Sequence, residues 1–332
     1  MKMRTLSIIG TAGLLALLVG ILSPATAANA VTTTGTSAQA LEIGPPVLNL
    51  TANPGQTINA TINLRDVSNG NLVVTNQIND FVASGEDGTP KIILDGTIPS
   101  TSLKSWINPI AQLTLKSKEV KTLTIAISVP SNASPGGYYG VVRFTGNAPE
   151  LSTTGVSLSA SLGSLILLKV NGQAKESLSV EQFFADKNGK PGNVFEAAPI
   201  TFVERLKNSG NILEQPAGVV TITDMFKNKI VTLGVNQPPV DVLPSSIRKF
   251  ESTLDSSNIG NRILFGYYKA DLSVTYGTDK QVITSSVGFW VIPYTLIIVS
   301  ILGLIAGFML LRFLIRRYNS HIISRSQKTK RK

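Results

Sequence analysis

Histidine and cysteine, the side chains that most often act as general bases, nucleophiles and metal ligands, are almost missing from this chain of 332 residues. The chain contains no Cys and a single His, His321, close to the C-terminus. A Cys nucleophile is therefore excluded, and no His base or His metal ligand is available to the rest of the chain. We expect no catalytic residues and no metal site.

The remaining motifs that could carry catalysis have simpler explanations. Ser246-Ile247-Arg248-Lys249 has SxxK spacing, but neither an SDN nor a KTG element accompanies it. Glu86, Asp87 and Asp186 lie in turn-like strings without the spacing of a calcium loop, and no signature pairs two carboxylates for glycoside hydrolysis. No Gly-rich phosphate loop follows a strand and opens a helix. The sequence predicts a protein that is not an enzyme and that needs no cofactor.

The candidates for ligand contact are instead aromatic. Tyr138 and Tyr139 follow two glycines in Pro135-Gly136-Gly137-Tyr138-Tyr139-Gly140, and Trp106 lies in a polar string that ends at Pro109. Alternation in a strand places the two tyrosines on opposite faces. One of them is then expected to pack inward with its hydroxyl tying the corner of the chain. The hypothesis is that the other is exposed as a stacking platform for a glycan, whereas Trp106 is assigned either to packing or to ligand contact.

The elements that position these residues are β-strands, because apolar residues alternate with polar ones. The pattern covers residues 57–65, 121–129 and 269–276, and the first of these places Ile58, Ala60, Ile62 and Leu64 on one face. Turn strings such as Asn53-Pro54-Gly55 and Gly85-Glu86-Asp87-Gly88 separate the apolar runs. No convincing helical periodicity appears between the two ends of the chain. Short strands at this spacing predict an all-β fold of sandwiches.

A coarse internal repeat predicts two such sandwiches in tandem. Residues 67–71 lie between two strand-like runs, and so do residues 207–211; Pro135 to Gly140 is echoed by Gly266-Tyr267-Tyr268. Each unit resembles an immunoglobulin-type sandwich, with no disulfide because Cys is absent. We expect a flexible leader at 31–40, a first sandwich at 41–172 and a second at 173–286.

The N-terminus has the layout of a secretory signal peptide. Lys2 and Arg4 precede an apolar run from Leu6 to Leu22, and small residues follow as far as Ala30. Two cleavage positions fit, after Ala27 or after Ala30, and we assign residues 1–30 to the signal. An uncleaved membrane anchor is the alternative, since the apolar run is long for a signal core.

A second apolar run predicts a transmembrane helix over residues 289–311. These 23 residues carry no charge and would span about 34 Å as a helix, which is enough for a hydrocarbon core. Phe289, Trp290 and Tyr294 lie at the predicted outer interface. The inner interface is predicted at Arg312, Arg316 and Arg317, with a basic cytoplasmic tail at 312–332.

The basic charge of the chain is confined to these ends. Lys and Arg number 30 against 20 Asp and Glu, with two bases before the first apolar run and eight after Leu311, so the part between is neutral. We interpret this as membrane orientation and expect no nucleic acid partner. The predicted topology is a single pass through the cell membrane, with the N-terminal part outside and the tail in the cytoplasm.

The order of motifs is similar to that of the WxL-interacting surface proteins of Gram-positive bacteria. The order runs from the export signal through Pro54-Gly55, Val129-Pro130 and the Pro135 to Gly140 turn to Asn208-Ser209-Gly210-Asn211, residues 289–293 and the basic tail. This resemblance implies a membrane-distal domain that contacts peptidoglycan and a proximal domain that binds small WxL-type surface proteins.

We therefore expect a membrane-anchored cell-surface protein that works by binding. Its expected partners are the lipid bilayer and either a cell-wall polymer or a WxL-type surface protein, with strand edges supplying contacts by β-addition. The alternative is a structural spacer or an assembly subunit of an envelope complex with no ligand of its own. The sequence leaves the oligomeric state open.

Overall fold

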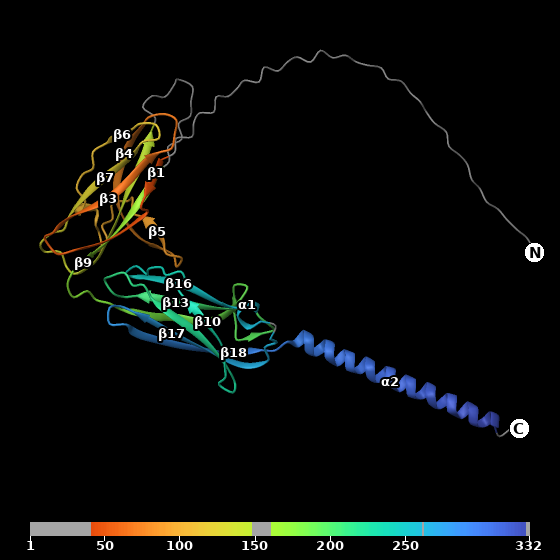
Figure 1. Ribbon diagram of the computed structural model, residues 1–332. Helices are drawn as coiled ribbons and strands as arrows, with labels where there is room; N and C mark the ends of the chain where they lie inside the picture. Colours follow the sequence, from red (N-terminus) through yellow and green to blue (C-terminus); the bar gives the residue numbers. More distant parts are fainter. Residues whose placement is uncertain (1–40, 148–160, 261, 330–332) are drawn as a thin grey trace, which may run out of the picture. The chain divides into compact units, whose positions relative to one another are not determined.

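The computed structural model describes residues 41–147, 161–260 and 262–329, and it contains two β-sandwiches followed by one long helix (Figure 1). This confirms the predicted class: an all-β chain with two tandem immunoglobulin-like sandwiches and an apolar C-terminal helix. The signal peptide predicted for residues 1–30 and the leader at 31–40 lie outside the described residues.

The first sandwich consists of one small sheet and one large sheet. The small sheet has the order β1 (Leu41–Gly44), β3 (Thr57–Asp66) and β7 (Val120–Ser128). The large sheet has the order β2 (Val47–Ala52), β9 (Ser161–Val170), β8 (Gly136–Asn147), β4 (Leu72–Ser84) and β5 (Thr89–Ile92), and β6 (Leu113–Leu115) also pairs with β4. A short 3-10 helix, η1, covers Lys104–Trp106.

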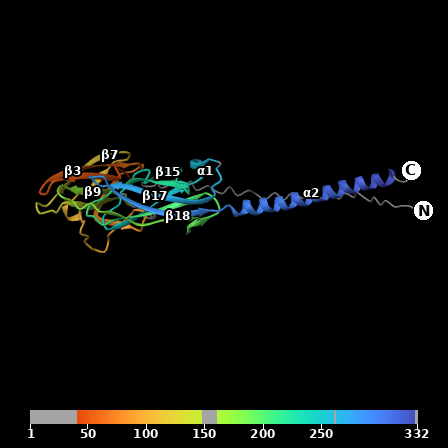
Figure 2. The ribbon, with the colours of Figure 1, turned by 90° about the horizontal axis from the view of Figure 1, so that it is seen from below.

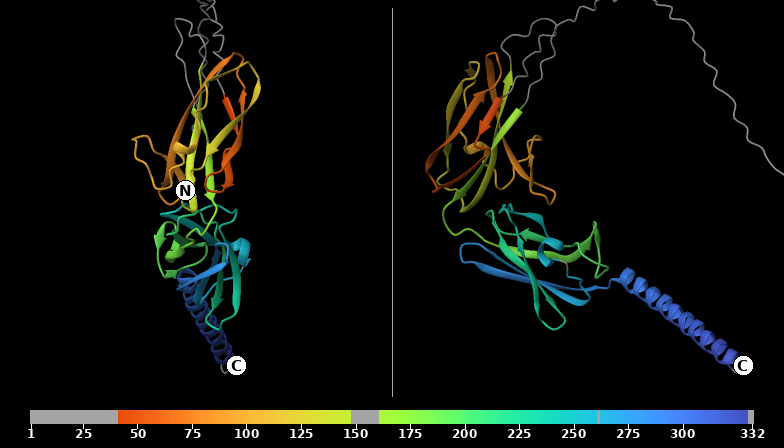
Figure 3. Two further views of the ribbon diagram at one scale, coloured as in Figure 1. Left: turned by 90° about the vertical axis from the view of Figure 1, so that its left-hand side faces the viewer. Right: turned by 45° about the vertical axis from the view of Figure 1, so that its right-hand side comes forward.

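The second sandwich repeats this plan after a linker of seven residues. One sheet has the order β11 (Lys190–Pro191), β10 (Leu178–Lys187), β13 (Ile200–Asn208) and β16 (Ser246–Leu254). The other has the order β12 (Val194–Phe195), β18 (Gln281–Val291), β17 (Gly266–Tyr276), β14 (Ala217–Asp224) and β15 (Lys229–Val235). A single helical turn, α1 (Ser256–Ile259), follows β16. The layers of both sandwiches can be followed in Figure 3.

The predicted alternation forms the two cores. In β3 every second residue from Ala60 to Asp66 is buried and the residues between them are exposed, as the sequence predicted for Ile62 and Leu64. In β17 Ala270, Leu272, Val274 and Tyr276 are buried in the same way, and the residues between them are exposed or half-buried. Each sandwich has its own large apolar cluster between its two sheets. Burial of apolar area is therefore what holds each sandwich together.

The internal repeat is real at the level of strand register. Gly136 of β8 lies opposite Val170, the last residue of β9, and Gly266 of β17 lies opposite Val291, the last residue of β18. In both sandwiches the first strand of the Gly-containing hairpin, β8 or β17, is the third of five in the strand order of its sheet. Figure 2 shows β17 and β18 side by side. Tyr138 and Tyr268 therefore occupy matching positions, two residues after the glycine.

The junction of the second sandwich and the helix differs from the sequence prediction. Phe289 and Val291 were assigned to a transmembrane helix that begins at residue 289, but they are fully buried in the second sandwich as part of β18. The second sandwich therefore extends beyond residue 286, to Val291. The error has a physical cause, because a buried strand and a membrane helix are both apolar and here follow each other without a polar break.

Helix α2 (Tyr294–Thr329) begins after only two linking residues, Ile292 and Pro293. Residues 294–319 form the one helix of the described part of the chain that is long and apolar enough to cross a membrane, with a mean hydropathy of 2.5 over its most apolar window. At the rise of an α-helix these 26 residues span about 39 Å. None of that window is buried against the rest of the protein.

Candidate functional site

The structure brings together two of the three aromatic residues that the sequence singled out. The rings of Trp106 in η1 and Tyr138 in β8 have centroids 4.1 Å apart with 40° between their planes. Both side chains are half-buried and pack against the core of the first sandwich. The Tyr138 hydroxyl donates a hydrogen bond to the carbonyl oxygen of Ser134 (3.0 Å), so it ties the turn in the way expected of an inward tyrosine.

Tyr139 points to the opposite face of β8, as alternation requires. It is only 2% exposed and packs with Phe81, Val141 and Leu167, together with Leu213 and Leu243 of the second sandwich. The hypothesis that one of the two tyrosines is exposed is therefore wrong: Tyr138 is half-buried and Tyr139 is fully buried. The reason is that the second sandwich covers the outer face of β8, which a strand pattern alone does not reveal.

Hydrogen bonds to main-chain atoms tie the two sandwiches together beside Tyr139. The amide N–H of Gly137 donates to the carbonyl oxygen of Asn211 (2.8 Å), and the Asn211 side-chain amide donates to the carbonyl of Pro135 (2.9 Å). A Cβ at Gly137 would collide with the Tyr139 hydroxyl. Glycine at this position is thus required for the close approach.

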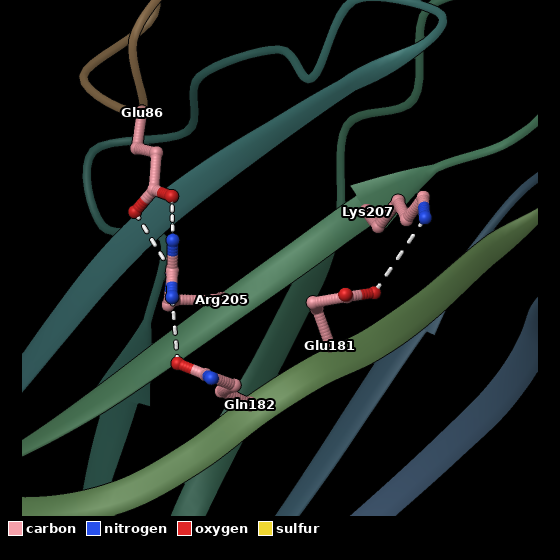
Figure 4. Close-up of polar contacts among 5 residues, drawn as sticks. All are labelled: Glu86, Glu181, Gln182, Arg205 and Lys207. Atoms are coloured by element: carbon pink, nitrogen blue, oxygen red, sulfur yellow. Dashed lines mark hydrogen bonds and ion pairs between the residues drawn. The ribbon is translucent and has the colours of Figure 1, made fainter.

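A second contact joins the β4–β5 turn to the second sandwich. The Nε and Nη2 atoms of Arg205 donate hydrogen bonds to the two carboxylate oxygens of Glu86 (Figure 4). The Nη1 atom of Arg205 donates to the side-chain oxygen of Gln182 at 2.6 Å. The carbonyl oxygen of Glu86 also accepts a hydrogen bond from the amide of Lys249 (2.8 Å). The predicted turn that contains Glu86 therefore has a structural role at the junction.

The junction contains a cavity of about 420 Å³ that sequence reasoning missed. Its walls include the edge strand β2, Tyr139, and the segment from Ile212 to Gln215 of the second sandwich. Two buried polar atoms at this cavity, the Tyr139 hydroxyl and the Oε1 atom of Glu214, have no hydrogen-bond partner of ordinary geometry in the described part of the chain. Unpaired buried polar atoms are costly, so this feature needs an explanation beyond folding.

The electrostatics of this cavity are set by three charged side chains. Burial, assisted by the negative charge of Glu176, raises the pKa of the Glu214 carboxyl to about 7. Hydrogen bonds from the hydroxyl and the amide of Thr278 lower the pKa of Glu176. Lys169 also lines the cavity and acts on both carboxylates. The cavity therefore has one permanent anion, one cation and one acid that titrates near neutrality.

A second buried acid lies away from this cavity, inside the second sandwich. Glu204 of β13 is 0% exposed, and neither of its carboxylate oxygens has a hydrogen-bond partner of ordinary geometry within the described ranges of the chain. Burial raises the pKa of this carboxyl to about 8. Counting back from the matching turns Asn69-Gly70-Asn71 and Ser209-Gly210-Asn211, the corresponding residue of the first sandwich is Leu64, which is also buried.

The predicted membrane-interface residues lie around the start and along the length of α2. Trp290 is the second-to-last residue of β18 and is 46% exposed, and Tyr294 begins the helix and is also exposed. Arg312, Arg316 and Arg317 are exposed in the same continuous helix. The tail predicted for residues 312–332 thus begins as helix. No group of three acidic or His side chains that could hold a metal occurs among the described residues.

Comparison with known proteins gives a likeness of fold. No protein-family model and no curated protein matches the chain. Among solved structures, the class 5 fimbrial chaperone CfaA is similar over 74% of this chain and 98% of its own, with a TM-score of 0.37 and 14% identity. The E. coli chaperone DraB matches over 76% and 97%, with a TM-score of 0.34 and 13% identity. The seventh PapD-like domain of human CEP192 covers 48% of this chain and 99% of its own, at a TM-score of 0.30 and 13% identity.

Proposed function

We propose that this protein is a membrane-anchored cell-surface binding protein that holds peptidoglycan or another surface protein through its exported sandwiches. In this proposal α2 crosses the cell membrane once, with the sandwiches outside and the basic end of the chain in the cytoplasm, as the distribution of Lys and Arg favours. The sequence resemblance to WxL-interacting surface proteins supports the choice of partners. The anchor is supported by the exposed apolar surface of residues 294–319.

The observation that carries the binding proposal is the junction cavity with its two unpaired polar atoms. Tyr139 and Glu214 are only 2% and 3% exposed, yet the Tyr139 hydroxyl and Glu214 Oε1 have no hydrogen-bond partner of ordinary geometry among the described residues. Because both atoms are buried, a bound chain could supply a donor to Glu214 and an acceptor or donor to Tyr139 only after the cavity wall shifts, and it would then satisfy both atoms. Binding then repays a desolvation cost that the unoccupied site carries.

The geometry of β2 fits an extended protein segment as the occupant. β2 is the last strand of its sheet, paired in parallel with β9 on one side, and no strand among the described residues pairs with its other side. Asn49, Leu50 and Thr51 of this strand line the cavity. An added strand would gain main-chain hydrogen bonds along β2, and its side chains would reach the cavity. We therefore favour a surface protein as the ligand of this site.

The pair of Trp106 and Tyr138 supports the second candidate, a glycan strand of peptidoglycan. Half-buried aromatic rings side by side offer an apolar surface on which a sugar can stack. Packing against the core and the satisfied Tyr138 hydroxyl explain this pair without a ligand. The glycan proposal thus has the weaker support of the two.

Site-specific photocrosslinking on intact cells tests the proposal. A photoreactive residue is placed at Thr51 or Gln215, which are exposed at the cavity, and at Thr61, an exposed control residue on the outer face of β3. We expect one defined surface protein to be captured from Thr51 and Gln215 but not from Thr61. Co-sedimentation of the full chain with purified sacculi, compared with a Trp106→Ala variant, tests the glycan candidate.

The alternative, a spacer without a ligand, predicts a different result. The sandwiches would be accessible to protease on whole cells, but no position around the cavity would give a specific crosslink, and sacculi would not retain the protein. That combination of results would replace the binding proposal with the spacer.

A further inference from the structure

The exposed apolar residues of the second sandwich gather at one end. Ten large apolar side chains are exposed between residues 171 and 293. Val219 and Val282 lie away from the end where β18 leaves the sheet, and the other eight, which are Val194, Ile292 and six more, lie at that end. We call these six the apolar collar: Met225, Phe226, Ile263, Phe265, Tyr267 and Trp290.

Strand register proves that the collar residues share this end. Tyr267 lies opposite Trp290, and their rings have centroids 5.4 Å apart. The turn after β14 begins at Asp224, which lies opposite Tyr268. A Cβ at Gly266 would come within 2.4 Å of the Met225 methyl carbon, so this turn reaches over the start of β17. The collar therefore extends along the edge formed by β18, β17 and β14, a width of about 10–15 Å.

The three most exposed members of the collar have no structural reason to be apolar. Phe226 is 77% exposed, Ile263 is 71% exposed and Phe265 is 64% exposed. Single exposed apolar residues are common on protein surfaces, but a contiguous group of aromatic and aliphatic residues at loop tips marks an interaction surface. The opposite end of the same hairpin has the polar turn Thr278-Asp279-Lys280.

The connection to α2 identifies what the collar meets. Val291 is fully buried in the sandwich core, and Tyr294 already belongs to the helix. The intervening link is three Cα steps long, so it extends at most about 11 Å. The headgroup region on one side of a bilayer is about 5–8 Å thick. If α2 spans the bilayer, the sandwich cannot retreat from the headgroup region without unfolding the end of β18.

Charge at this end also favours a lipid surface. Lys190, Lys227, Lys229 and Arg262 are exposed near the collar. Three acids at this end accept local hydrogen bonds: Asp224 accepts from the amides of Phe226 and Asn228, Asp255 caps α1, and Glu196 accepts from the hydroxyl of Thr295. Aromatic and aliphatic residues surrounded by exposed cations are the composition of segments that lie in an anionic membrane interface.

We propose that the collar is a membrane-docking surface, which inserts the tips at Phe226, Ile263 and Phe265 into the outer headgroup region and holds the second sandwich against the bilayer. This inference rests on the proposed membrane anchor and adds a second, non-helical contact to it. The partner is an anionic lipid surface. The first sandwich is then the part of the molecule that is available to partners away from the membrane.

Single-cysteine spin labelling of the full chain tests this inference, because the chain has no Cys of its own. Variants Phe226→Cys, Phe265→Cys, Asp279→Cys and Ile305→Cys are reconstituted into vesicles of phosphatidylethanolamine and phosphatidylglycerol. Each nitroxide is measured for collision with oxygen, which concentrates in lipid, and with a water-soluble nickel chelate. Residues 226 and 265 are exposed, so their replacement removes no core packing.

We expect labels at 226 and 265 to favour oxygen over nickel, and the control label at 279 to favour nickel. The label at 305 reports independently on the helix. If 226 and 265 behave like 279 while 305 is in lipid, the docking surface is wrong and the anchor stands. If 305 is also in water, the anchor fails as well, and the docking surface with it.

Discussion

Strands β8 and β17 occupy the same place in the two sandwiches, yet one is buried on both faces and the other on one. Both begin with a Gly opposite the last residue of the neighbouring strand, followed two residues later by an inward tyrosine. On the outer face β8 places Tyr139 and Val141, which are each 2% exposed. At the matching positions β17 places Lys269 and Asp271, which form a half-exposed ion pair at 2.6 Å.

This difference follows from the contact between the sandwiches, which covers the outer face of β8 but not that of β17. A strand in a sandwich needs apolar residues only on the face that meets the other sheet. Because Leu213 and Leu243 of the second sandwich cover β8, the outer face of β8 belongs to a separate buried apolar cluster. The outer face of β17 has no such cover and retains charge. Apolar residues therefore lie on both faces of Tyr139-Gly140-Val141-Val142, and this departure from alternation indicates the junction in the sequence.

Exchanging the outer-face residues of β8 and β17 should have the largest effect on stability. Val141→Asp places an unpaired carboxylate in a buried interface and should cost about 3–5 kcal/mol of stability. Asp271→Val, its counterpart on β17, removes only an exposed pair and should change stability by less than about 1 kcal/mol. Hydrogen exchange of β8 and β17 in the full chain in nanodiscs measures both. Equal effects would mean that β8 is not covered in solution.

The inner faces differ at Glu204, and this difference predicts a dependence on pH. The folded pKa of about 8 lies above the unfolded value, so the folded state holds the proton more tightly. The free energy of unfolding of the second sandwich, as far as it depends on Glu204, is therefore highest below about pH 4 and falls as pH rises to 8. We expect a loss of about 2–4 kcal/mol over that range.

Glu204→Leu supplies the residue found at the matching position of the first sandwich. This variant should flatten the pH dependence and stabilise the second sandwich above pH 7. Thermal unfolding of the full chain at several pH values checks the effect, with the exposed-face substitution Glu181→Leu as control. Unchanged pH dependence in Glu204→Leu would assign it to another group.

Three of the four tyrosines at the start of β8 and β17, namely Tyr138, Tyr139 and Tyr268, should respond differently to loss of the hydroxyl. Tyr138→Phe loses the bond to Ser134, and Tyr268→Phe loses its contacts with the backbone of Phe265, so each should cost about 1 kcal/mol. Tyr139→Phe removes a buried hydroxyl that has no hydrogen-bond partner of ordinary geometry in the described part of the chain, and it should be neutral or stabilising. Unfolding midpoints of the three variants test this order, which would be reversed if Tyr139 were satisfied in solution.

The ion pair of Arg205 and Glu86 at the junction should contribute the least to stability. Arg205→Gln breaks the contact with Glu86 and should cost about 0.5–1 kcal/mol, with faster exchange of the Lys249 amide that bonds Glu86. Lys207→Gln breaks a comparable pair on the same strand, Lys207 with Glu181 at 3.8 Å (Figure 4), and should have no measurable effect. A double-mutant cycle of Arg205→Gln with Glu86→Gln isolates the coupling. Zero coupling would show that the pair does not join the sandwiches.

Much of the fold could be predicted because its signals are local. The strands around Ile62 and Ala270 follow from alternation, and the apolar run over residues 289–311 predicts a helix long enough for a membrane, although the helix begins only at Tyr294. The site was only partly predictable. The opposite faces of Tyr138 and Tyr139 follow from strand geometry, but the cavity beside Glu214 depends on several segments that lie as far apart in the chain as Asn49 and Thr278.

Periodicity and hydropathy are properties of single segments, so the class of fold, the tandem repeat and the apolar C-terminal segment can be inferred without any knowledge of contacts. The surface that covers each apolar residue depends on contacts between distant segments. Val141 meets the other sandwich, Phe289 meets the core of its own sandwich, and Ile305 remains exposed. The physical reason is that the hydrophobic effect is non-directional: it requires that apolar area leave water but does not specify which surface covers it.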